Sequence, residues 1–242
     1  MEDLTICIRT YKENKILLEK CLKSLSQQKE IEKSQIIIYN DGCVIETLNC
    51  INEFIRQNPQ LNILVVYKNK QIGSGAAFKE LYKLVKTTYM IFGDGDDEYI
   101  LNDGLFTAMS NLKMNNWNFI NTDNSKFKLH QMTIFNKQCI NEHLFINFST
   151  RDDEYMSYIY TFVNGGFYNY PFYKWNYNHS FSQIHFKEFK DEEKKLWEIY
   201  SSLVNKKISV DQALNMINSL NVVSYNDIKE DLMKLCETNL FN

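Results

Sequence analysis

The chain has 242 residues, of which 44% are hydrophobic and 24% charged, a composition that suits one large globular domain with or without an appendage. Its formal net charge of −3 argues against nucleic acid or an anionic membrane as the main partner. The 6 cysteines form no C-x-x-C pair, which argues against a zinc site and favours reduced, buried thiols.

The longest apolar runs, such as residues 63–67, are far too short to span a bilayer. The acidic N-terminus at residues 1–3 leads directly into a strand-like segment, unlike a signal peptide. We therefore expect a soluble, cytoplasmic protein without a transmembrane segment. A peripheral contact with the inner face of the membrane stays open.

In the first half of the chain, short β-rich runs alternate with amphipathic helical stretches. The pattern predicts strands at residues 4–9, 35–39, 61–67 and 89–92, and helices at residues 15–27, 45–57 and 76–86. Such alternation indicates an α/β fold with a mainly parallel, Rossmann-like central sheet and flanking helices.

The second half of the chain is less regular. The pattern predicts helices at residues 103–113 and 149–163, and strands at residues 117–121 and 126–135. Residues 165–189 are rich in Tyr and Phe, and the pattern from there onward is helical and charged. We predict one domain at residues 1–185 and a small helical C-terminal extension at residues 186–242.

Polar residues follow three of the predicted strands. They are Thr10-Tyr11, Asp41-Gly42 and the acidic cluster at residues 94–98. Because ligands bind at the carboxyl ends of parallel strands, the three sites should meet along one edge of the sheet.

The acidic cluster contains Asp94, Asp96 and Asp97, whose negative charges repel one another unless a cation compensates them. Their hard oxygen ligands favour Mg²⁺ or Mn²⁺, which would also bridge two phosphates of a nucleotide. Three other interpretations compete. An EF-hand calcium loop needs Gly at its sixth position, where Tyr99 stands. A phosphatase of the haloacid dehalogenase type usually has Thr or Val after the second Asp and a site near the N-terminus, and neither feature is present here. The last alternative is a solvated turn.

Six short segments carry a resemblance to a known family. In chain order they are ICIRTYKE at residues 6–13, SLSQ at 24–27, IIIYNDGC at 36–43, NKQIG at 69–73, FGDGDD at 92–97 and YKWNYNHS at 173–180. They resemble the Thr-Tyr-Asn-Glu turn, the Ser-Leu-x-x-Gln helix end, the Asp-Asp-Gly-Ser strand end, the Asn-x-Gly segment, the metal-binding DXD motif and the late Tyr-x-Tyr and His-x-Ser segment of family 2 glycosyltransferases. The resemblance covers about residues 4–183 and implies the GT-A fold.

The resemblance implies how a donor nucleotide is bound. Thr10 and Tyr11 would lie against the nucleobase, and Glu13 belongs to the same turn. Asp41 would accept the ring N–H of the base, which favours a uracil nucleotide. Gly73 lies in a Gly-Ser-Gly that is too incomplete for a dinucleotide loop, and it would permit a tight turn beside the donor. Packing of the Tyr11 ring and a simple turn at Asp41 are the structural alternatives.

The resemblance also implies where the diphosphate and the metal lie. Asp94 would contact the ribose or the metal, while Asp96 and Asp97 would hold the metal at the diphosphate. His179 is a candidate contact to the diphosphate or the metal, although a lone histidine is more often structural. Trp175 and the tyrosines beside it would stack on an acceptor sugar or only pack.

The chain departs from the family pattern at three places. Family members often have Ala-Arg-Asn after the Asn-x-Gly segment, and that Arg aids donor binding. Residues 77–79 are Ala-Phe-Lys here, so only Lys79 is left as a loose substitute. Lys12 replaces the usual Asn, and Asn40 replaces the first Asp of the Asp-Asp pair. These departures bear on the nucleotide preference more than on the reaction.

An inverting transfer needs a carboxylate that removes the proton of the acceptor hydroxyl. The family takes it from a Glu-Asp pair that opens a helix, and residues 151–154 match that place, with Asp153 the better candidate and Asp152 its neighbour. Acidic residues in a first helical turn also suit the helix dipole, and Ser149 and Thr150 are good N-caps. The family position favours a catalytic base.

We therefore predict a metal-dependent inverting glycosyltransferase with Mn²⁺ or Mg²⁺ as cofactor. It would move a hexose or N-acetylhexosamine from a nucleotide-sugar donor, a UDP-sugar by preference, to a carbohydrate or lipid-linked acceptor. The family implies a role in surface polysaccharide synthesis. Two alternatives stay open: a metal-dependent phosphatase with Asp94 as nucleophile, and a non-catalytic sugar-nucleotide or protein-binding module on a transferase fold.

Overall fold

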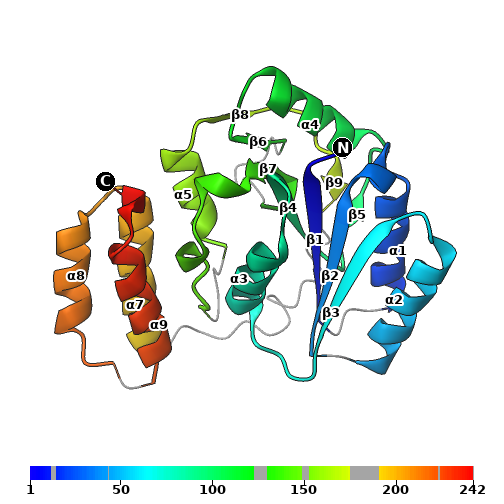
Figure 1. Ribbon diagram of the computed structural model, residues 1–242. Helices are drawn as coiled ribbons and strands as arrows, with labels where there is room; N and C mark the ends of the chain where they lie inside the picture. Colours follow the sequence, from blue (N-terminus) through cyan, green and yellow to red (C-terminus); the bar gives the residue numbers. More distant parts are fainter. Residues whose placement is uncertain are drawn as a thin grey trace.

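The computed structural model describes residues 1–11, 15–42, 44–122, 130–148, 153–174, 191–222 and 224–241. Within these residues, seven strands form one mixed sheet in the order β3-β2-β1-β4-β7-β6-β8 (Figure 1). The strands are β1 Leu4–Thr10, β2 Gln35–Asp41, β3 Asn62–Lys68, β4 Tyr89–Asp94, β6 Phe119–Asn121, β7 Thr133–Asn136 and β8 Gly165–Phe167. A separate antiparallel ribbon pairs β5, Glu98–Tyr99, with β9, Tyr173–Lys174.

The parallel half of the sheet brings three strand ends to one edge. β1 lies between β2 and β4, and the register pairs Thr10 with Asn40 and Arg9 with Asp94. These three strands are almost entirely buried, as their continuous apolar runs require when helices cover both faces. β7 runs antiparallel to both β4 and β6, which makes the sheet mixed.

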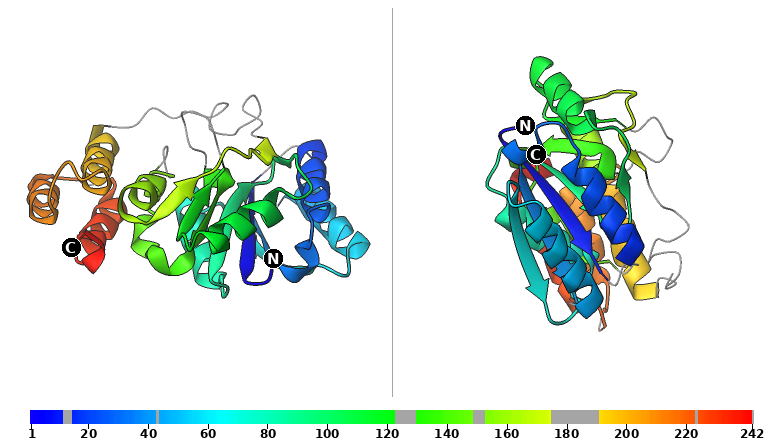
Figure 2. Two further views of the ribbon diagram at one scale, coloured as in Figure 1. Left: turned by 90° about the horizontal axis from the view of Figure 1, so that it is seen from above. Right: turned by 90° about the vertical axis from the view of Figure 1, so that its right-hand side faces the viewer.

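Helices cover both faces of this sheet (Figures 1 and 2). They are α1 Lys15–Ser26, α2 Ile45–Gln57, α3 Ser74–Leu84, α4 Gly104–Met114, α5 Tyr155–Phe162, α7 Asp191–Val204, α8 Val210–Ser219 and α9 Asn226–Cys236. Short 3₁₀ turns are η1 Ile31–Lys33, η2 His130–Met132, η3 Lys137–Cys139, η4 Glu142–Leu144 and η6 Asn239–Phe241. Along β2, Ile36 and Ile38 enter one core with α1, α2 and α4. Ile37 and Tyr39 point the other way, into a core shared by α3, α5 and α7–α9.

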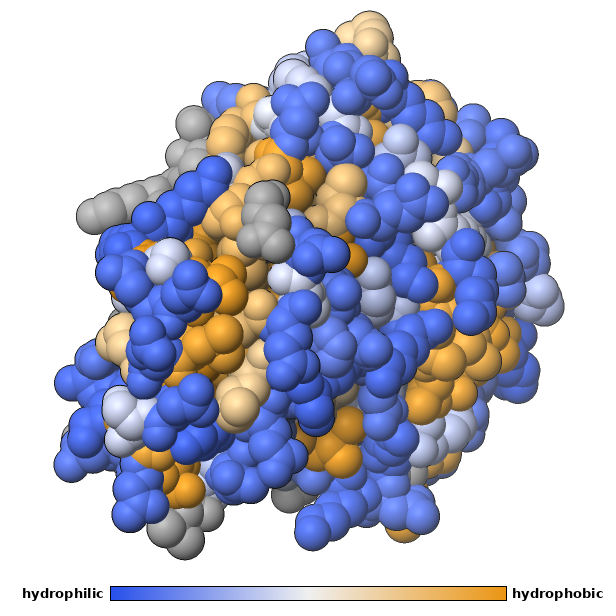
Figure 3. All heavy atoms as spheres, turned by 60° about the vertical axis from the view of Figure 1, so that its left-hand side comes forward, coloured by the Kyte–Doolittle hydropathy of each residue, from blue (hydrophilic) through white to orange (hydrophobic). Residues whose placement is uncertain are grey.

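Helices α7, α8 and α9 form the predicted C-terminal helical extension at one end of the sheet, next to α5 (Figure 2). Leu196 of α7 and Leu232 of α9 are fully buried in the same core as Phe78 of α3. The outer surface on this side is mostly hydrophilic, with separate apolar patches (Figure 3). The predicted boundary at 185/186 falls outside the described residues, so the division into two domains stays a prediction.

The α/β fold class is confirmed, and the first four strands and three helices agree with the predicted segments to within a few residues. Two predicted elements differ. The strand expected at 126–135 is the shorter β7, preceded by the turn η2, and residues 123–129 lie outside the description. The helix expected at 149–163 is described from Tyr155 onward as α5.

The described cysteines are free thiols, as the sequence indicated. They are Cys7, Cys21, Cys50, Cys139 and Cys236. Burial raises the pKa of the Cys236 thiol to about 11, so it stays protonated at neutral pH. None of the helices in the described ranges is both long and apolar enough to cross a bilayer.

Candidate active site

The carboxylate of Asp94, at the end of β4, is already held inside the protein. Arg9 of β1 donates to its Oδ1 from Nε at 3.1 Å and from Nη2 at 2.7 Å. Gln131 of η2 donates from Nε2 to Oδ2 at 2.7 Å. The two charged side chains are only 20% and 18% exposed, so Arg9 compensates the charge of Asp94 without a metal ion.

The guanidinium of Arg9 also lies over the ring of Phe78, 4.5 Å from its centroid. Phe78 belongs to the Ala-Phe-Lys segment that stands where family members often have Ala-Arg-Asn. An arginine is therefore present at this edge of the sheet, but it comes from β1. Sequence reasoning missed Arg9 because it was counted as a strand residue. The available signal was a single charged residue in an otherwise uncharged, buried strand.

The loop that carries Asp96 and Asp97 folds back against β1. The N–H of Gly95 donates to the carbonyl of Arg9 at 2.8 Å, and a Cβ at Gly95 would lie 3.1 Å from Cβ of Thr10. Asp97 is 1% exposed, and its N–H donates to the carbonyl of Asp94 at 3.3 Å. Asp96 is half-buried. The fold thus brings the predicted metal-binding loop next to the predicted nucleobase site.

Within the described residues, no three His, Cys, Asp or Glu side chains are arranged to hold a metal ion by themselves. Mg²⁺ in nucleotide enzymes usually takes one or two carboxylates and completes its shell with phosphate oxygens and water. Asp96 and Asp97 offer two hard oxygen donors of that kind, whereas Asp94 is engaged by Arg9 and Gln131. The donor set fits a metal that binds together with a diphosphate.

Two buried tyrosines, Tyr173 and Tyr99, pack against the backbone at the start of the acidic loop. The hydroxyl of Tyr173 accepts the N–H of Asp94 at 3.0 Å, and its ring meets the ring of Tyr99 edge-on at 4.9 Å. A Cβ at Gly93 would lie 3.1 Å from the hydroxyl of Tyr173 and 3.2 Å from that of Tyr99, so only glycine fits this approach comfortably. Tyr173, 2% exposed, therefore packs under the loop and does not stack on an acceptor sugar.

Asp41, at the end of β2, binds the turn before α3. Its Oδ1 accepts the N–H of Ile72 at 2.8 Å, and its Oδ2 accepts the N–H of Gly73 at 3.2 Å. Asp41 is 2% exposed, and this burial raises the pKa of its carboxyl group even though the two hydrogen bonds lower it. A Cβ at Gly42 would lie 3.0 Å from the ring of Tyr11. The predicted donor residues on β1, on β2 and in this turn therefore lie together.

Asn147 fastens the same turn to the segment that leads toward the candidate base. Its Nδ2 donates to the carbonyl of Ile72 at 3.0 Å, and its Oδ1 accepts the N–H of Ala76 at 3.4 Å. Gly73 has a φ of 92°, and a Cβ there would meet Oδ1 of Asn147 at 2.5 Å. Sequence reasoning missed Asn147, because nothing in its own neighbourhood marks a contact 75 residues away.

Lys79 needs a correction. We expected it to substitute loosely for the missing arginine at the donor. Its ammonium instead pairs with Asp231 of α9, with 3.3 Å between Nζ and Oδ1. Lys79 therefore ties α3 to the C-terminal helices, and Arg9 is the cation in contact with the acidic loop.

The candidate base Asp153 is exposed just before α5, and its carbonyl accepts the N–H of Met156 at 3.0 Å. Burial, and then the nearby charges of Glu154 and Asp153, raise the pKa of Tyr200 on α7. Asp152, Glu13 and His179 lie outside the described residues, so their predicted roles stay predictions.

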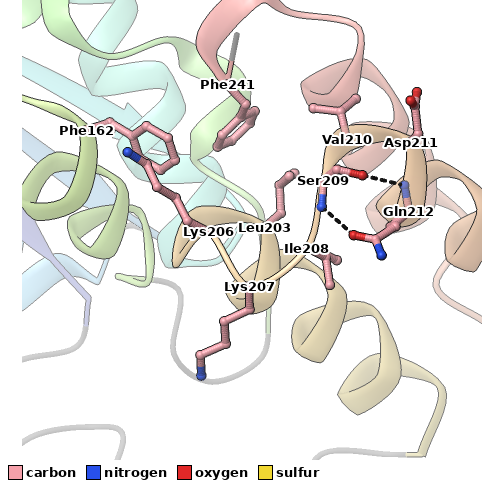
Figure 4. Close-up of a pocket in the computed structure, with 10 residues that line it drawn as sticks. All are labelled: Phe162, Leu203, Lys206, Lys207, Ile208, Ser209, Val210, Asp211, Gln212 and Phe241. Carbon is pink, nitrogen blue, oxygen red and sulfur yellow. Dashed lines mark hydrogen bonds between the residues drawn. The ribbon is translucent and has the colours of Figure 1, made fainter.

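A surface hollow of about 610 Å³ lies away from this edge, between the end of α5 and the turn from α7 to α8 (Figure 4). Phe162, Leu203 and Phe241 line its apolar side. At its other side Ser209 and Gln212 bond each other's backbone N–H groups in a capping box that opens α8. None of the predicted site residues lines this hollow.

Comparisons with known proteins agree with this geometry. Residues 5–103 match the model of glycosyl transferase family 2. Over 82 residues, the chain is 33% identical to a processive diacylglycerol beta-glycosyltransferase of Mycoplasma pneumoniae, a match that covers 34% of this chain and 24% of that protein. The match thus spans about a quarter of the relative's length.

Solved structures with the same fold cover nearly the whole chain. The S. aureus TarS 1-349 complex with UDP-GlcNAc has a TM-score of 0.63 at 16% identity and covers 97% of this chain and 71% of that one. A mannosyltransferase from Pyrobaculum calidifontis, in complex with GDP-Man and Mn²⁺, has a TM-score of 0.59 at 11% identity and covers 97% and 69%. At these identities the likeness shows the fold. Together, the comparisons show that residues 5–103 are similar to glycosyl transferase family 2 and that the chain has the GT-A fold.

Proposed function

We propose that the protein is a metal-dependent inverting glycosyltransferase that uses a nucleoside diphosphate sugar, with UDP as the preferred nucleotide. One observation carries the proposal. Tyr11, Asp41 and the acidic loop at residues 94–97 come from three separate strands and lie together at one edge of the sheet. TarS with UDP-GlcNAc and the mannosyltransferase with GDP-Man support a donor of this class.

In this proposal the donor nucleotide lies across the ends of β1 and β2. The ring of Tyr11 packs on the nucleobase, and Asp41 accepts a ring N–H from it. Each oxygen of Asp41 already takes one backbone N–H, and a carboxylate oxygen has a second lone pair for a further donor. The same two backbone hydrogen bonds hold the carboxylate rigid, which favours selection of one base over another.

We assign the metal to Asp96 and Asp97 and the ribose side of the donor to Asp94. The charge of Asp94 is met by Arg9, and the pair has limited exposure, so this carboxylate has the least to gain from a cation. When bound, Mn²⁺ or Mg²⁺ supplies positive charge that stabilises the departing diphosphate. The same engagement of both Asp94 oxygens argues against a phosphatase in which Asp94 attacks phosphorus.

For the transfer itself, we assign the base to Asp153. Its carboxylate takes the proton from the acceptor hydroxyl while that oxygen forms a bond to the anomeric carbon and the bond to the diphosphate breaks. Attack from the face opposite the diphosphate inverts the anomeric centre. The exposure of Asp153 suits access by an acceptor from solvent or from a lipid surface.

The acceptor class is a carbohydrate or a lipid-linked sugar. The name of the Mycoplasma pneumoniae relative, a diacylglycerol glycosyltransferase, supports a lipid acceptor over a free sugar. With a lipid acceptor, the protein would act at the inner face of the membrane, and it would need no spanning helix to do so. Synthesis of surface polysaccharide remains the family expectation for the product.

The deciding experiment is a thermal-shift panel of UDP, GDP and their sugars, each with and without Mn²⁺. A ligand that binds the folded state raises the melting temperature by mass action, so the panel reads the base and the metal independently of turnover. We expect a shift with UDP-sugars that needs Mn²⁺ and is lost in Asp96→Asn and Asp97→Asn. Asp211→Asn, an exposed carboxylate on α8, is the control.

No shift with any nucleotide would contradict the proposal. Trapping of Asp94 by beryllofluoride would favour the phosphatase. A metal-dependent shift without any transfer or hydrolysis would favour the non-catalytic binding module.

A further inference from the structure

The first turn of α5 is tied to a helix far along the chain through Glu154. Oε1 of Glu154 accepts the hydroxyl of Ser201 at 2.9 Å and the amide Nδ2 of Asn205 at 3.4 Å, both on α7. It also accepts the hydroxyl of Ser157 on α5 itself at 3.2 Å. One carboxylate oxygen thus joins α5 to α7 through residues that are 47 positions apart in sequence.

Helix α7 is a firm anchor for that contact. The hydroxyl of Tyr200 donates to the carbonyl of Leu144 at 2.6 Å, and its ring lies 5.6 Å from that of Phe148. Leu196 and Tyr200 are at most 1% exposed, in the core that also contains α3 and β4. α7 therefore holds a fixed position relative to the sheet that carries the donor site.

Glu154 follows Asp153 directly, and the two side chains are in different surroundings. Asp153 is exposed, whereas Glu154 is half-buried with three hydrogen bonds on one oxygen. Three donors on one oxygen hold the Glu154 carboxylate in a defined position between α5 and α7. Because one planar peptide bond joins Asp153 to Glu154, holding Glu154 limits where the Asp153 backbone can lie.

We propose that Glu154 is a positioning residue, which Ser201 and Asn205 hold so that Asp153 meets the acceptor hydroxyl in the right geometry. The C-terminal helices then serve the reaction directly, by fixing the base relative to the donor. This inference rests on the proposed function, in which Asp153 is the base. Misplacement of a catalytic group by about 1 Å can cost on the order of a hundredfold in rate, so such a contact has a measurable effect.

The test compares five variants of the full chain with a UDP-sugar, Mn²⁺ and an acceptor. The double variant Ser201→Ala with Asn205→Ala removes both α7 donors, and Glu154→Ala removes the acceptor oxygen. We expect kcat to fall by about tenfold or more in both, with the KM for the donor and the Mn²⁺-dependent thermal shift by UDP unchanged. Glu154→Gln keeps the Oε1 acceptor, and we expect it to retain most of the wild-type kcat.

Asp231→Asn is the matched control, because it breaks a contact between the same helical group and α3 without touching residues 153–154. If it lowers kcat as much as the double variant does, general loosening of the C-terminal helices explains the effect and positioning by Glu154 is refuted. A loss in Glu154→Gln as deep as in Asp153→Asn would also refute it, since Glu154 itself would then be needed in the reaction.

The two proposals fail in distinguishable ways. If Asp153→Asn keeps normal transfer, the assignment of the base is wrong whatever the Glu154 variants do. If Asp153→Asn is inactive but the double variant has wild-type kcat, the base assignment stands and the role of Glu154 is overturned.

Discussion

The proposed donor edge, formed by the ends of β1, β2 and β4, and the proposed base segment at residues 153–154 are built in different ways. The donor edge uses strand ends from the first hundred residues, and Arg9, Asp41 and Asp94 are held by neighbouring strands and turns. The base segment before α5 is not part of the sheet, and Glu154 reaches α7 for support. Variants of the two regions should therefore separate kinetically, with binding lost at the donor edge and turnover lost at the base.

The largest effect is expected at the base. Asp153→Asn keeps the shape of the side chain but cannot accept the hydroxyl proton, and general base catalysis contributes about 10²–10⁴-fold. We expect kcat to fall by that range while the UDP-sugar and Mn²⁺ still raise the melting temperature as in the wild type. Steady-state kinetics and thermal shift on one preparation check this, with Asp211→Asn as the control. A parallel loss of donor binding would show that the two regions are not separate.

A smaller effect is expected when Arg9 is replaced, and it should appear in donor affinity alone. Arg9→Met removes two hydrogen bonds to Asp94 and leaves the aromatic ring of Phe78 covered. Hydrogen bonds to charged groups contribute about 1.5–3 kcal/mol to holding Asp94 in place, and we expect the displaced carboxylate to weaken donor affinity by roughly tenfold. Titration calorimetry with UDP and Mn²⁺ measures it. Arg56→Met, which removes the exposed pair with Glu53 on α2, should leave the affinity unchanged.

Gly75 marks the place where the two regions touch. A Cβ there would lie 2.4 Å from the carbonyl oxygen of Ile146, and this atom can move only if the backbone moves. We expect Gly75→Ala to lower the free energy of unfolding by roughly 1–3 kcal/mol, as overpacking does, and to reduce both donor affinity and kcat. Urea denaturation measures the first effect, and Ser74→Ala is the neighbouring comparison. An unchanged midpoint would mean that the junction is looser than the structure indicates.

The smallest effect concerns the pH dependence of stability at Asp41. Burial raises the pKa of Asp41 above its unfolded value, so its stabilising contribution is fully present at low pH and is lost as the pH rises through the raised pKa. An Asn at this position does not titrate. The melting temperature of Asp41→Asn should therefore improve relative to the wild type as the pH rises above about 4. A difference that moves the opposite way with pH would mean that hydrogen bonding, not burial, governs this carboxylate.

Much of the fold and part of the site follow from local sequence patterns. The apolar runs of β1, β2 and β4 specify buried strands, because a strand covered on both faces needs apolar side chains at nearly every position. The polar residues that end these runs then meet at one edge, because parallel neighbours present the same end. Tyr11, Asp41 and the acidic loop could be predicted together for that reason.

The partners of those residues were decided only by the tertiary structure. Arg9 meets Asp94, Lys79 meets Asp231 and Glu154 meets Ser201 at separations of 85, 152 and 47 residues. The sequence contains many possible partners for any one charged or hydroxyl side chain. The residues next to that side chain in sequence do not indicate which partner it contacts. The choice comes from the packing of α3, α5 and α7 around a shared core, where apolar burial sets the helix positions and the polar contacts follow.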